Sequence, residues 1–506
     1  MDNLSKEDRS KCMSRIRSKH TGIEKKIFSI LDKRGIYYQK HYKRAYGKPD
    51  IAVPSIKLAV FLDSDFWHGW YFPQWKYRLP EKYWQDKIER NRERDKKNFS
   101  KLRRQGWKVI RLWGHQIKND PEKCADIIHE AVIKRKKMLQ HDVISLFSGC
   151  GGMDIGIEGG FNYLGRRYPK TGFKVIWAND IDEKACETFN KNFNGTKCIC
   201  GDIEDINIWN SMPDECEMVI GGFPCQDFSI TRATKRKGIE VKRGKLYQSF
   251  VKTVAEKSPK VFIAENVKGI LSANKRKAIK LITKEFAHIN GGYNIYCNLY
   301  KFVEYGVPQM RERVLIIGIR SDIDYKYSKP KSLPEDKYLT AGDALKGIAD
   351  DIPNHNYMSR KERTKKILEA IPEGENINYL PKQHPLYVKG LMSNIYRRLD
   401  RNKPSPTIIA CGGGGTWGYH YKEPRALTNR ERARIQSFPD DFEFAGGNAD
   451  VRRQIGNAVP PVGIYHVAKE LKKAFKAEVN NNNKKYVEIN ICGDKKIEEL
   501  KNDIPF

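Results

Sequence analysis

Long apolar runs are absent from this sequence. We find no stretch of about 18 consecutive apolar residues, the length that a helix needs to cross a bilayer, and therefore expect no association with a membrane. The opening run MDNLSKEDRSKC also lacks the apolar segment of a secretory signal. We expect a soluble protein of the cytoplasm, in which the 11 cysteines are reduced thiols.

Acidic residues are scarce relative to basic ones. The chain has 94 Lys and Arg against 62 Asp and Glu, a formal net charge of +32, and residues 1–140 hold 35 basic against 17 acidic residues. Such a field attracts polyanions, so nucleic acid is the favoured partner. The alternative is a solvated basic surface, which the aromatic residues interleaved with these charges disfavour. Nothing in the sequence indicates an obligate protein partner.

The chain is too long for one compact core, at 506 residues and roughly 150 residues per domain. A cationic run at 134–137 closes a helix-like segment, and the apolar strand DVISLF opens at Asp142. We therefore place a boundary near residue 140. The predicted parts are a domain at 1–138, a linker at 139–141, a catalytic domain at 142–320 and 425–475, an inserted domain at 321–424, and a tail at 476–506.

Strand-like and helix-like segments alternate after residue 142. The strands DVISLF, KVIWAND, EMVIGG and KVFIAEN are separated by helical runs such as EKACETFNKNF. This alternation predicts an α/β fold with a doubly wound, mostly parallel sheet. The pattern fails at 321–424, which is typical of a variable insert. The tail, with four asparagines at 480–483, is polar, and we expect it to be loosely ordered.

Three of the predicted strand ends carry glycine or carboxylate groups. The run FSGCGGMDIG follows the first strand and enters a helix, where glycines let a ligand approach the backbone and helix N–H groups. The second strand ends in Asp180, placed to hydrogen-bond ribose hydroxyls, and GDI adds Asp202. Together these loops suit a cofactor that contains adenosine.

One cysteine stands in a loop suited to nucleophilic chemistry. Cys225 follows a proline in GGFPCQDFS, directly after an apolar strand. Methylation of cytosine is one reaction that requires such a cysteine. Carbon 5 of cytosine is a poor nucleophile, and a thiolate added to carbon 6 makes the ring an enamine-like species that can attack a methyl donor. Backbone dipoles in such a loop can lower a thiol pKa. A buried structural cysteine is the alternative, which this loop disfavours.

These segments resemble the DNA cytosine-5 methyltransferase family, in the family's order, through nearly all of residues 142–475. ENV, VPQMRER, RALTNRERARIQSFPDDF and QIGNAVPP also match. The resemblance implies a Rossmann-like domain that binds S-adenosylmethionine. It implies a cofactor site made by Phe147, Gly149, Gly151, Gly152, Asp180, Ile181, Asp202, Ile203, Pro224 and Asn457.

The same resemblance implies the catalytic residues and the substrate. Cys225 would be the nucleophile, Glu265 would hold and protonate ring nitrogen 3, and Arg311 would bear on the pyrimidine oxygen and the catalytic loop. The residues implied to contact DNA are Gln226, Ser229 and Arg313. The target cytosine would be flipped out of double-stranded DNA. The insert at 321–424, which contains GGGGTWGYH, falls where such enzymes place their target-recognition domain.

The first 138 residues indicate a different chemistry. KPDIAV places Asp50 at the start of a strand, and KLAVFLDSDFWHG ends a second strand at Asp63, with His68 shortly after. Two strand-end carboxylates can share a divalent ion that activates water and neutralises charge on a phosphodiester. A histidine beside them could move the proton. Surface aspartates and a packed histidine are the alternative.

This segment resembles the very-short-patch repair endonucleases, through RSKCMSRIRSKHTGIEK, KPD, FWH and RERD. The resemblance implies a restriction-endonuclease-like α/β domain that binds Mg²⁺ through Asp50 and the Leu62 carbonyl. It implies that His68 is the base and that Glu24 and Asp95 order water at the metal. The aromatic residues implied to wedge into DNA beside a T·G mismatch are Phe66, Trp67 and Trp84.

Two departures from this family bear on the site. Some members bind a structural zinc, whereas the matching positions here are Asp65, Trp70, Phe72 and His115, so we predict no structural zinc. Asp63 stands where some members have histidine, and it could add a metal ligand or alter the base.

The leading hypothesis is a bifunctional enzyme that methylates cytosine and nicks DNA at the T·G mismatch left when methylcytosine deaminates. The first alternative is a restriction–modification fusion whose nuclease cuts unmethylated paired DNA. A lysine two residues after Asp63 would favour this alternative. That position holds Asp65, which argues against it. The second alternative is a methyltransferase with an inactive, DNA-binding nuclease domain.

Overall fold

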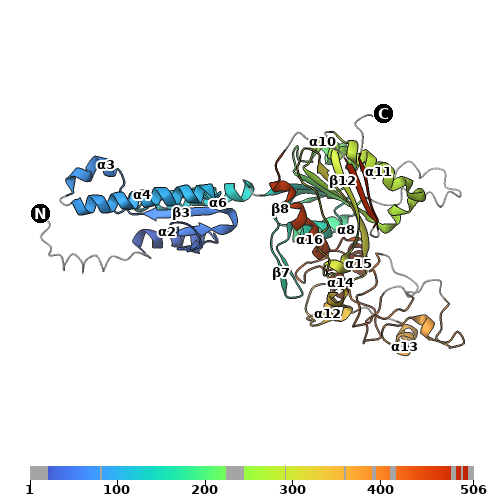
Figure 1. Cartoon of the computed structure of the whole chain (residues 1–506). Helices are drawn as coiled ribbons and strands as arrows, with labels where there is room; N and C mark the ends of the chain where they lie inside the picture. The colour runs from blue at the N-terminus through green and yellow to red at the C-terminus, as the bar shows by residue number, and fades with distance from the viewer. Residues whose placement is uncertain are drawn as a thin grey trace. The chain divides into compact units, whose positions relative to one another are not determined.

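The computed structural model describes residues 21–79, 82–138, 140–223, 244–290, 292–357, 361–389, 395–410, 418–479, 486–491 and 494–499. The chain divides into two compact units, Met1–Gln140 and His141–Phe506, called unit 1 and unit 2 below (Figure 1). Among the described helices, none combines the length and the apolarity that a membrane crossing requires.

Unit 1 is built on a four-stranded sheet of order β1-β2-β3-β4. Its strands are β1 (Gln39–Lys40), β2 (Ile51–Val53), β3 (Leu58–Asp63) and β4 (Lys108–Trp113). Its helices are α2 (Gly22–Lys33), α3 (Phe72–Trp75), α4 (Lys82–Arg104), α5 (Gly114–Asn119) and α6 (Pro121–Met138). β3 is antiparallel to β2 and parallel to β4. This is a mixed α/β domain, as the sequence predicts.

Side chains of β3 alternate between two apolar layers. Val60 and Leu62 pack with residues of α2 and α6, whereas Phe61 packs against Phe99 of α4 with ring centroids 4.7 Å apart. Successive side chains of a strand point to opposite faces, so Asp63 continues the series of Phe61. Its carboxylate therefore lies on the side of the sheet that α4 covers.

Unit 2 contains a nine-stranded sheet of order β15-β14-β12-β13-β11-β10-β5-β8-β9. The strands are β5 (His141–Leu146), β8 (Phe173–Asp180), β9 (Cys198–Cys200), β10 (Met218–Gly221), β11 (Val261–Val267), β12 (Tyr293–Lys301), β13 (Glu312–Arg320), β14 (Tyr486–Ile491) and β15 (Asp494–Glu499). The strands from β11 to β9 are parallel, and β13 is antiparallel to both neighbours. The chain winds outward from β5 in both directions, so the predicted doubly wound sheet is confirmed, with its switch point between β5 and β10.

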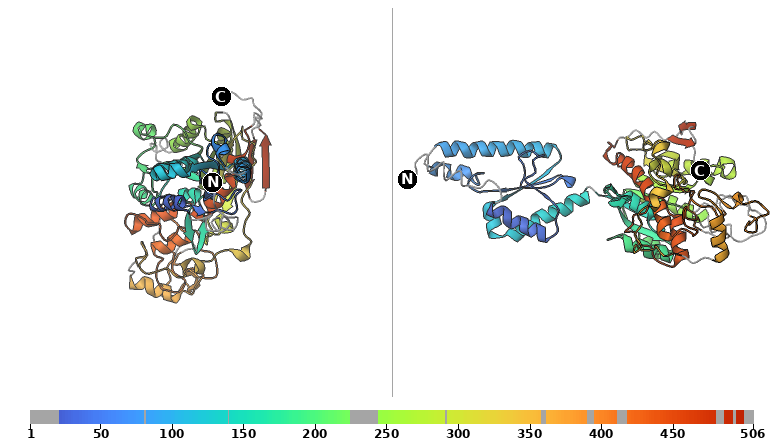
Figure 2. Two further views of the ribbon diagram at one scale, coloured as in Figure 1. Left: turned by 90° about the vertical axis from the view of Figure 1, so that its left-hand side faces the viewer. Right: turned by 90° about the horizontal axis from the view of Figure 1, so that it is seen from below.

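Helices cover both faces of this sheet (Figure 1 and Figure 2). One face carries α7 (Gly152–Glu158), α8 (Glu183–Asn192) and α16 (Pro461–Leu471), and the other carries α10 (Gly244–Lys257) and α11 (Lys277–His288). Val143 of β5 joins the first apolar layer and Ile144 joins the second. The predicted strands are continuous apolar runs because both of their faces are buried.

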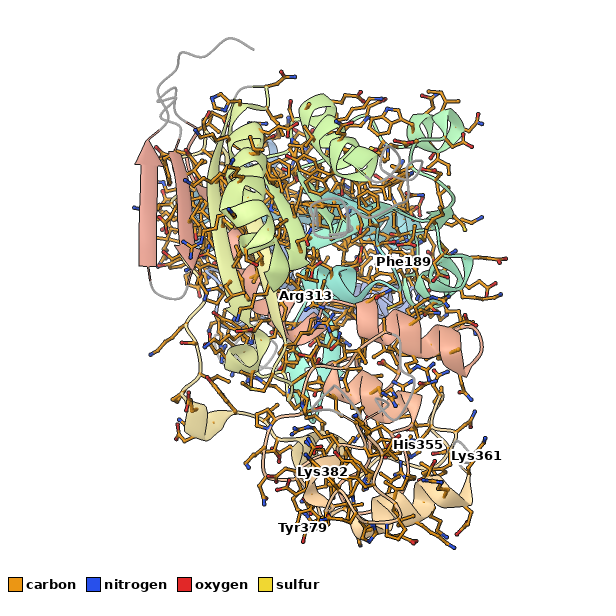
Figure 3. The ribbon with its side chains drawn as sticks, turned by 90° about the vertical axis from the view of Figure 1, so that its right-hand side faces the viewer. Phe189, Arg313, His355, Lys361, Tyr379 and Lys382 are labelled. Carbon is orange, nitrogen blue, oxygen red and sulfur yellow. The ribbon has the colours of Figure 1, made fainter. Side chains whose placement is uncertain are left out.

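Shorter elements complete unit 2. They are the hairpin of β6 (Phe161–Tyr163) and β7 (Arg166–Tyr168), and the helices α9 (Ile206–Asn210), α12 (Ala341–Leu345), α13 (Glu362–Ala370), α14 (Asn429–Ile435) and α15 (Asn448–Asn457). The described residues of 321–424 contain only short regular elements, and most of them form a lobe, whereas Ile323 and Tyr327 pack in the core beside the sheet. In Figure 3, Tyr379 and Lys382 lie in this lobe, and Arg313 lies at the end of the sheet that faces it.

Arginine side chains hold the lobe together where strands do not. The buried guanidinium of Arg398 donates to four backbone carbonyls at 2.6–3.3 Å, those of Leu368, Ile371, His420 and Tyr421. Buried carbonyls that lack a strand partner need another donor. One arginine thus satisfies carbonyls from two separate segments of the lobe.

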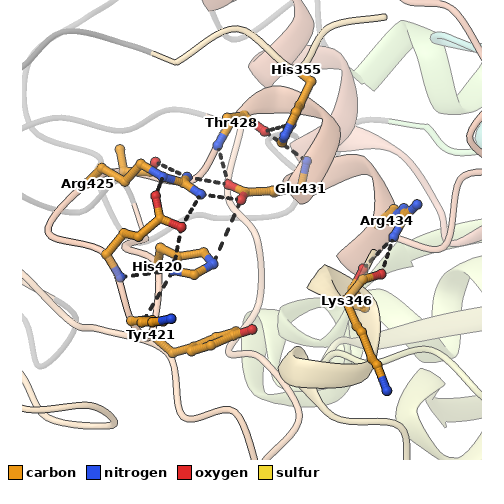
Figure 4. A network of polar contacts seen from close by, with 12 residues as sticks. Lys346, His355, His420, Tyr421, Arg425, Thr428, Glu431 and Arg434 are labelled. Atoms are coloured by element: carbon orange, nitrogen blue, oxygen red, sulfur yellow. Dashed lines mark hydrogen bonds and ion pairs between the residues drawn. The ribbon is translucent and has the colours of Figure 1, made fainter. Parts of the chain in front are cut away.

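A polar network joins the lobe to α14 (Figure 4). Glu431, which is 2% exposed, accepts two hydrogen bonds from Arg425, at 2.7 and 2.8 Å. Thr428 caps α14 and exchanges hydrogen bonds with Glu431 in a capping box. The Nδ1 of His355 lies 2.9 Å from the Thr428 hydroxyl. The buried carboxylate therefore has an arginine as its counter-ion.

The expectation of a loosely ordered tail is wrong for the last two strands. β14 pairs in parallel with β12, and β15 pairs antiparallel to β14, so both extend the sheet. Val487 is 4% exposed and joins the apolar layer on the α11 side. Val487, Ile489 and Ile491 alternate with polar residues, which is the period of a strand. The asparagines before them obscured this signal.

Gly318 on β13 leaves no room for a side chain, because an added Cβ would overlap the ring of Phe262. That ring is fully buried on β11. We expect Gly318→Ala to lower the free energy of unfolding of unit 2 by about 1–3 kcal/mol, since a packed core cannot shift the ring freely. Urea unfolding measures this loss. Gly269→Ala is the matched control, because its nearest neighbour would be 3.9 Å from the new Cβ. Equal losses would contradict this packing.

Candidate active sites

A cavity of about 700 Å³ opens at the carboxyl ends of β5, β8, β10 and β11 in unit 2. This is the switch point of the sheet, where doubly wound folds bind ligands. Of the residues expected at the cofactor, the cavity is lined by Phe147, Gly149, Gly152, Asp180, Ile181, Asp202, Ile203 and Asn457. Gly151 belongs to the same loop without lining the cavity, and Pro224 falls outside the described residues.

The glycine-rich loop is tied to the end of β8. Gly151 has a φ of 90°, and a side chain there would overlap Phe193. The N–H of Gly149 donates to Asp180 Oδ2 at 2.7 Å. Burial raises the pKa of Asp180, and hydrogen bonds from the N–H groups of Asp182 and Gly149 act against this rise. The next residue, Ile181, is 73% exposed, so an apolar surface stands beside the carboxylate.

Glu265 of β11 lies in the wall of the same cavity. Its Oε1 lies 2.9 Å from the Nε of Arg313, and 12% of the glutamate side chain is exposed. Burial raises the pKa of Glu265, and the charges of Arg313 and Arg311 act against this rise. A carboxyl with a raised pKa can hold a proton and pass it to a bound base.

Arg311 and Arg313 lie in different surroundings. Arg311 is 1% exposed, and its guanidinium donates to three backbone carbonyls at 2.9–3.2 Å, those of Ile408, Gly456 and Ala458. It joins the segment at Ile408 to the end of α15, where Gly456 and Ala458 line the cavity. Arg313, two residues later, lines the cavity and contacts Glu265. Of the two arginines, Arg313 is thus the one beside Glu265 in the cavity wall, and the expected contact of Arg311 with the catalytic loop falls on residues outside those described.

The predicted nucleophile lies outside the described residues. Cys225 falls in the stretch 224–243, as do the expected DNA contacts Gln226 and Ser229. Gly222 and Phe223, which precede this stretch, line the cavity. Asp154, which the sequence did not single out, lines it too. Burial raises the pKa of Asp154 to about 7.

Unit 1 contains two groups of possible metal ligands among its described residues. The first, called the Asp50 cluster, is Glu24, His41 and Asp50, and the second, called the His68 cluster, is Asp63, His68 and Asp95. Within each cluster the ligand atoms lie within 4.8 Å of one another. The structure thus brings together every titratable residue that the sequence proposed for this site, in two sets.

The Asp50 cluster surrounds a histidine that the sequence analysis missed. His41 Nε2 lies 3.3 Å from Glu24 Oε2, and its Nδ1 lies 3.7 Å from Asp50 Oδ1. The N–H of Leu62 donates to Asp50 Oδ2 at 2.8 Å, and the expected binding of a metal by the Leu62 carbonyl stays a prediction. Burial raises the pKa of Asp50 to about 7, and the charge of Glu24 adds to the rise. His41 follows β1 and Asp50 precedes β2, and the N–H of His41 donates to the Asp50 carbonyl. The pairing of these two strands therefore brings His41 to the Asp50 cluster.

The His68 cluster is held by an arginine that the sequence analysis also missed. His68 Nδ1 lies 2.7 Å from Asp95 Oδ2 and 3.5 Å from Asp63 Oδ1. Arg111 Nε donates to Asp63 Oδ2 at 2.5 Å, and a second guanidinium nitrogen donates to Asp95 at 3.0 Å. Asp50 and Asp63, which the sequence analysis expected to share a metal, thus fall in different clusters, and Asp63 has Arg111 as its partner.

The three expected wedge residues form one aromatic group. Ring centroids are 4.9 Å apart for Phe66 and Trp67, and 5.7 Å apart for Trp67 and Trp84. Phe66 is 40% exposed. The ammonium of Lys87 lies 5.2 Å from the Trp67 ring and 5.3 Å from the Trp84 ring. Trp67 and Trp84 are partly buried, and accessible rings with a cation beside them suit contact with unstacked bases.

The positions that match a zinc site in some relatives hold a different arrangement. Asp65 Oδ1 lies 2.6 Å from His115 Nδ1. The ring of Trp70 packs on His115 with centroids 4.9 Å apart, and Phe72 is fully buried. A hydrogen bond and ring contacts thus join these segments.

Both units of the chain match known families. The sequence model of the C-5 cytosine-specific DNA methylases matches residues 141–473, and that of the DNA mismatch endonuclease Vsr matches residues 1–74. The second match covers Asp50, Asp63 and His68, and stops before Asp95 and Arg111.

Curated relatives and a solved structure match unit 2. Type II methyltransferase M.NgoFVII of Neisseria gonorrhoeae is 50% identical over 340 residues, which cover 66% of this chain and 87% of the relative. Type II methyltransferase M.BbvI of Brevibacillus brevis is 43% identical over 370 residues, covering 70% and 97%. A prophage-encoded E. coli protein described as a DNA modification methyltransferase superposes with a TM-score of 0.52 at 25% identity, covering 67% of this chain and 100% of that one. This chain therefore belongs to the C-5 cytosine-specific DNA methylase family, and it carries a Vsr-like domain at its amino terminus.

Proposed function

We propose that unit 2 transfers a methyl group from S-adenosylmethionine to carbon 5 of cytosine at a particular site in double-stranded DNA. The cavity carries this proposal, because it joins the expected cofactor loops to Glu265 and Arg313 and extends to Phe223. Cys225 is two residues further along the chain from Phe223. A cofactor, a cytosine ring and a thiol can meet there.

The cavity fits the proposed cofactor by its donor set. The Asp180 carboxylate suits ribose hydroxyls, and the exposed Ile181 and the buried Ile203 suit the two sides of an adenine ring, with Asp202 at its edge. The glycine loop lets the backbone approach the rest of the ligand. When bound, S-adenosylmethionine supplies an electrophilic methyl group.

Cys225 and Glu265 act on the ring together. The thiolate of Cys225 adds to carbon 6 while Glu265 passes a proton to nitrogen 3, which leaves carbon 5 electron-rich. Arg313 holds Glu265 in place, 2.9 Å away. A base stacked in a duplex cannot expose carbon 6, so the cytosine flips into the cavity. The lobe at 321–424 lies at the end of the sheet where Arg313 lies, a place suited to contacts with the flanking DNA (Figure 3).

We also propose that unit 1 nicks DNA at T·G mismatches with the help of Mg²⁺. Two carboxylates and an imidazole converge in the Asp50 cluster, and the repulsion between Glu24 and Asp50 helps to raise the pKa of Asp50. A divalent cation relieves this repulsion, so the cluster fits such an ion. When bound, the ion neutralises charge on the phosphodiester and activates water.

His68 is oriented to act as the base of this reaction. Asp95 engages its Nδ1 at 2.7 Å, which leaves Nε2 to accept a proton. The aromatic group of the exposed Phe66 and the partly buried Trp67 and Trp84 favours a mispaired site, where unstacking costs least. T·G mispairs arise when 5-methylcytosine deaminates, so unit 1 would act on the decay product of the unit 2 reaction.

A second candidate function for unit 1 is cleavage of unmethylated paired DNA. In a chain whose relatives are named type II methyltransferases, methylation by unit 2 would protect the cell's own DNA from such a nuclease. The aromatic group favours the mismatch instead. A DNA-binding module without nuclease activity is the third candidate, and the cutting assay below separates all three.

Substitution of two residues should separate chemistry from cofactor binding. We expect Cys225→Ala to abolish methyl transfer while the dissociation constant of S-adenosylmethionine changes little. Asp180→Ala should weaken cofactor binding about 10- to 100-fold, because hydrogen bonds to a charged group are lost. Isothermal titration and transfer of labelled methyl groups to DNA measure the two effects. Cys124→Ala, in unit 1, is the control for a lost thiol. Methyl transfer by Cys225→Ala would contradict the proposal.

Arg313→Gln leaves the Glu265 carboxylate buried without its ion pair. We expect unit 2 to lose about 3 kcal/mol of unfolding free energy at about pH 8, and much less at about pH 5. The pKa of Glu265 in the folded protein is already raised, and the loss of Arg313 raises it further. The contribution of Glu265 to the free energy of unfolding of the variant is therefore fully present below the unfolded-state pKa, and it is lost as the pH rises through the folded-state pKa.

Urea unfolding over a pH series measures this loss. Arg320→Gln removes a more exposed pair with Asp322, whose side chain is 29% exposed, and should cost at most about 1 kcal/mol. A loss from Arg313→Gln that is the same at both pH values would show that Glu265 is not the group involved.

The full chain with Mg²⁺ should nick a duplex that carries a T·G mispair at the methylated site, and leave the fully paired duplex intact. Asp50→Ala should abolish nicking, and Asp86→Ala, an exposed aspartate of α4, should not. Denaturing gels with each strand labelled report the cut. Equal cutting of paired DNA would indicate a restriction enzyme. Intact DNA in every reaction would leave only the binding module.

A further inference from the structure

Arg111 places a fixed positive charge inside the His68 cluster. Its guanidinium contacts Asp63 at 2.5 Å and Asp95 at 3.0 Å. The exposed fractions are 6% for the Asp63 side chain, 10% for Asp95 and 25% for Arg111. Two carboxylates that are largely withdrawn from water therefore share one cation, which offsets part of their charge.

Aromatic rings fix the position of this guanidinium. Its central carbon lies 4.2 Å from the centroid of Trp113 and 5.2 Å from that of Phe99. Such contacts stabilise a planar guanidinium and restrict its rotation. Arg111 is thus a built part of the cluster and differs from an arginine that samples solvent.

Strand and helix periodicity bring these groups to one face. In the parallel pairing of β3 and β4, Phe61 lies opposite Arg111 and Asp63 lies opposite Trp113. All four side chains therefore belong to the face that α4 covers. Asp95 is one of the buried residues of α4, on the same helix side as Ile88, Phe99 and Leu102.

The two clusters of unit 1 thus differ in how their charge is balanced. The His68 cluster already holds a cation between its carboxylates. The Asp50 cluster brings Glu24 and Asp50 to a histidine, and a divalent ion would balance these two charges. A metal ion bound to Asp63 Oδ2 would have to displace the Arg111 contact at 2.5 Å, and one bound to Oδ1, which faces His68, would be repelled by the arginine charge on the same carboxylate.

We infer that Arg111 is the resident cation of the His68 cluster, that Asp63 is its counter-ion and not a metal ligand, and that Arg111 positions His68 through Asp95. This inference rests on the proposed nuclease activity of unit 1. Without Arg111, the carboxylates of Asp63 and Asp95 would face each other with His68 between them. The 2.7 Å contact that orients His68 would no longer be held in one geometry.

The test uses the full chain and Mn²⁺ alone as the metal probe, with the variants Asp63→Asn, Arg111→Gln, Arg111→Lys, Asp50→Asn and the double variant of Asp63 and Arg111. Isothermal titration should give Mn²⁺ dissociation constants within about twofold of the wild type for Asp63→Asn, and a loss of at least about tenfold for Asp50→Asn. A comparable loss in Asp63→Asn would overturn the inference, because Asp63 would then be a ligand.

Nicking of the T·G duplex at saturating Mn²⁺ should fall about 10- to 100-fold in Asp63→Asn and in Arg111→Gln. The double variant should fall no further than the worse single variant, since both remove one contact, and Arg111→Lys should recover part of the rate. Independent, multiplying losses would overturn the positioning role. Methyl transfer by the same preparations controls for protein quality.

A spectroscopic signal makes the test independent of cutting. In histidine-labelled protein, the Nδ1–H resonance of His68, assigned with His68→Gln, should shift downfield in the wild type and lose that shift in Arg111→Gln. An unchanged resonance would overturn the inference. If the wild type binds Mn²⁺ but cuts nothing, the nuclease proposal fails, and the titration and the resonance still decide the roles of Asp63 and Arg111.

Discussion

Carboxylates buried at the ends of strands need a positive partner, and this requirement shapes both units. Removing a charge from water costs far more than a surface contact returns, unless a counter-ion is close. Glu265 meets Arg313 at 2.9 Å, and Asp63 meets Arg111 at 2.5 Å. Asp50, whose neighbour is another acid, has a pKa raised to about 7. The kind of partner decides what each carboxylate can do.

A fixed arginine and an exchangeable ion give a carboxylate different chemistry. Arg313 orients Glu265 while burial keeps the pKa of that carboxyl raised, so the group can still carry a proton. Arg111 does the reverse for Asp95: burial acts to raise the pKa of Asp95, but His68 and Arg111 lower it overall. Asp95 therefore remains an acceptor for His68. An arginine that contacts a carboxylate repels a metal ion at the same group, and Asp63 has such an arginine in Arg111.

Much of the unit 2 cavity could be predicted from the sequence because its parts are local. The glycine loop, Asp180 and Asp202 each follow a predicted strand, and the ends of parallel strands meet at one edge of the sheet. Arg111 and His41 could not be predicted in this way. Each reaches its site through pairing with a distant strand, and single residues of β4 or of the chain beside β1 carry no mark of that partner. The strand near Val487 was missed for a different reason, since the polar composition around it outweighed a short alternating pattern.

Side chains one or two positions apart in the sequence have entirely different roles in this protein. Arg311 precedes β13 and turns into the protein to bind carbonyls, while Arg313 on the strand lines the cavity. On β3, Leu62 serves the α2 side and Asp63 the α4 side. A family motif fixes which residues are present, and strand register then fixes which of them meet.

The fusion of the two activities can be understood through their substrate. Methylation of a cytosine and its later deamination are separate events, so the two units are linked by the DNA site that they share, and the proposed repair does not require their active sites to touch.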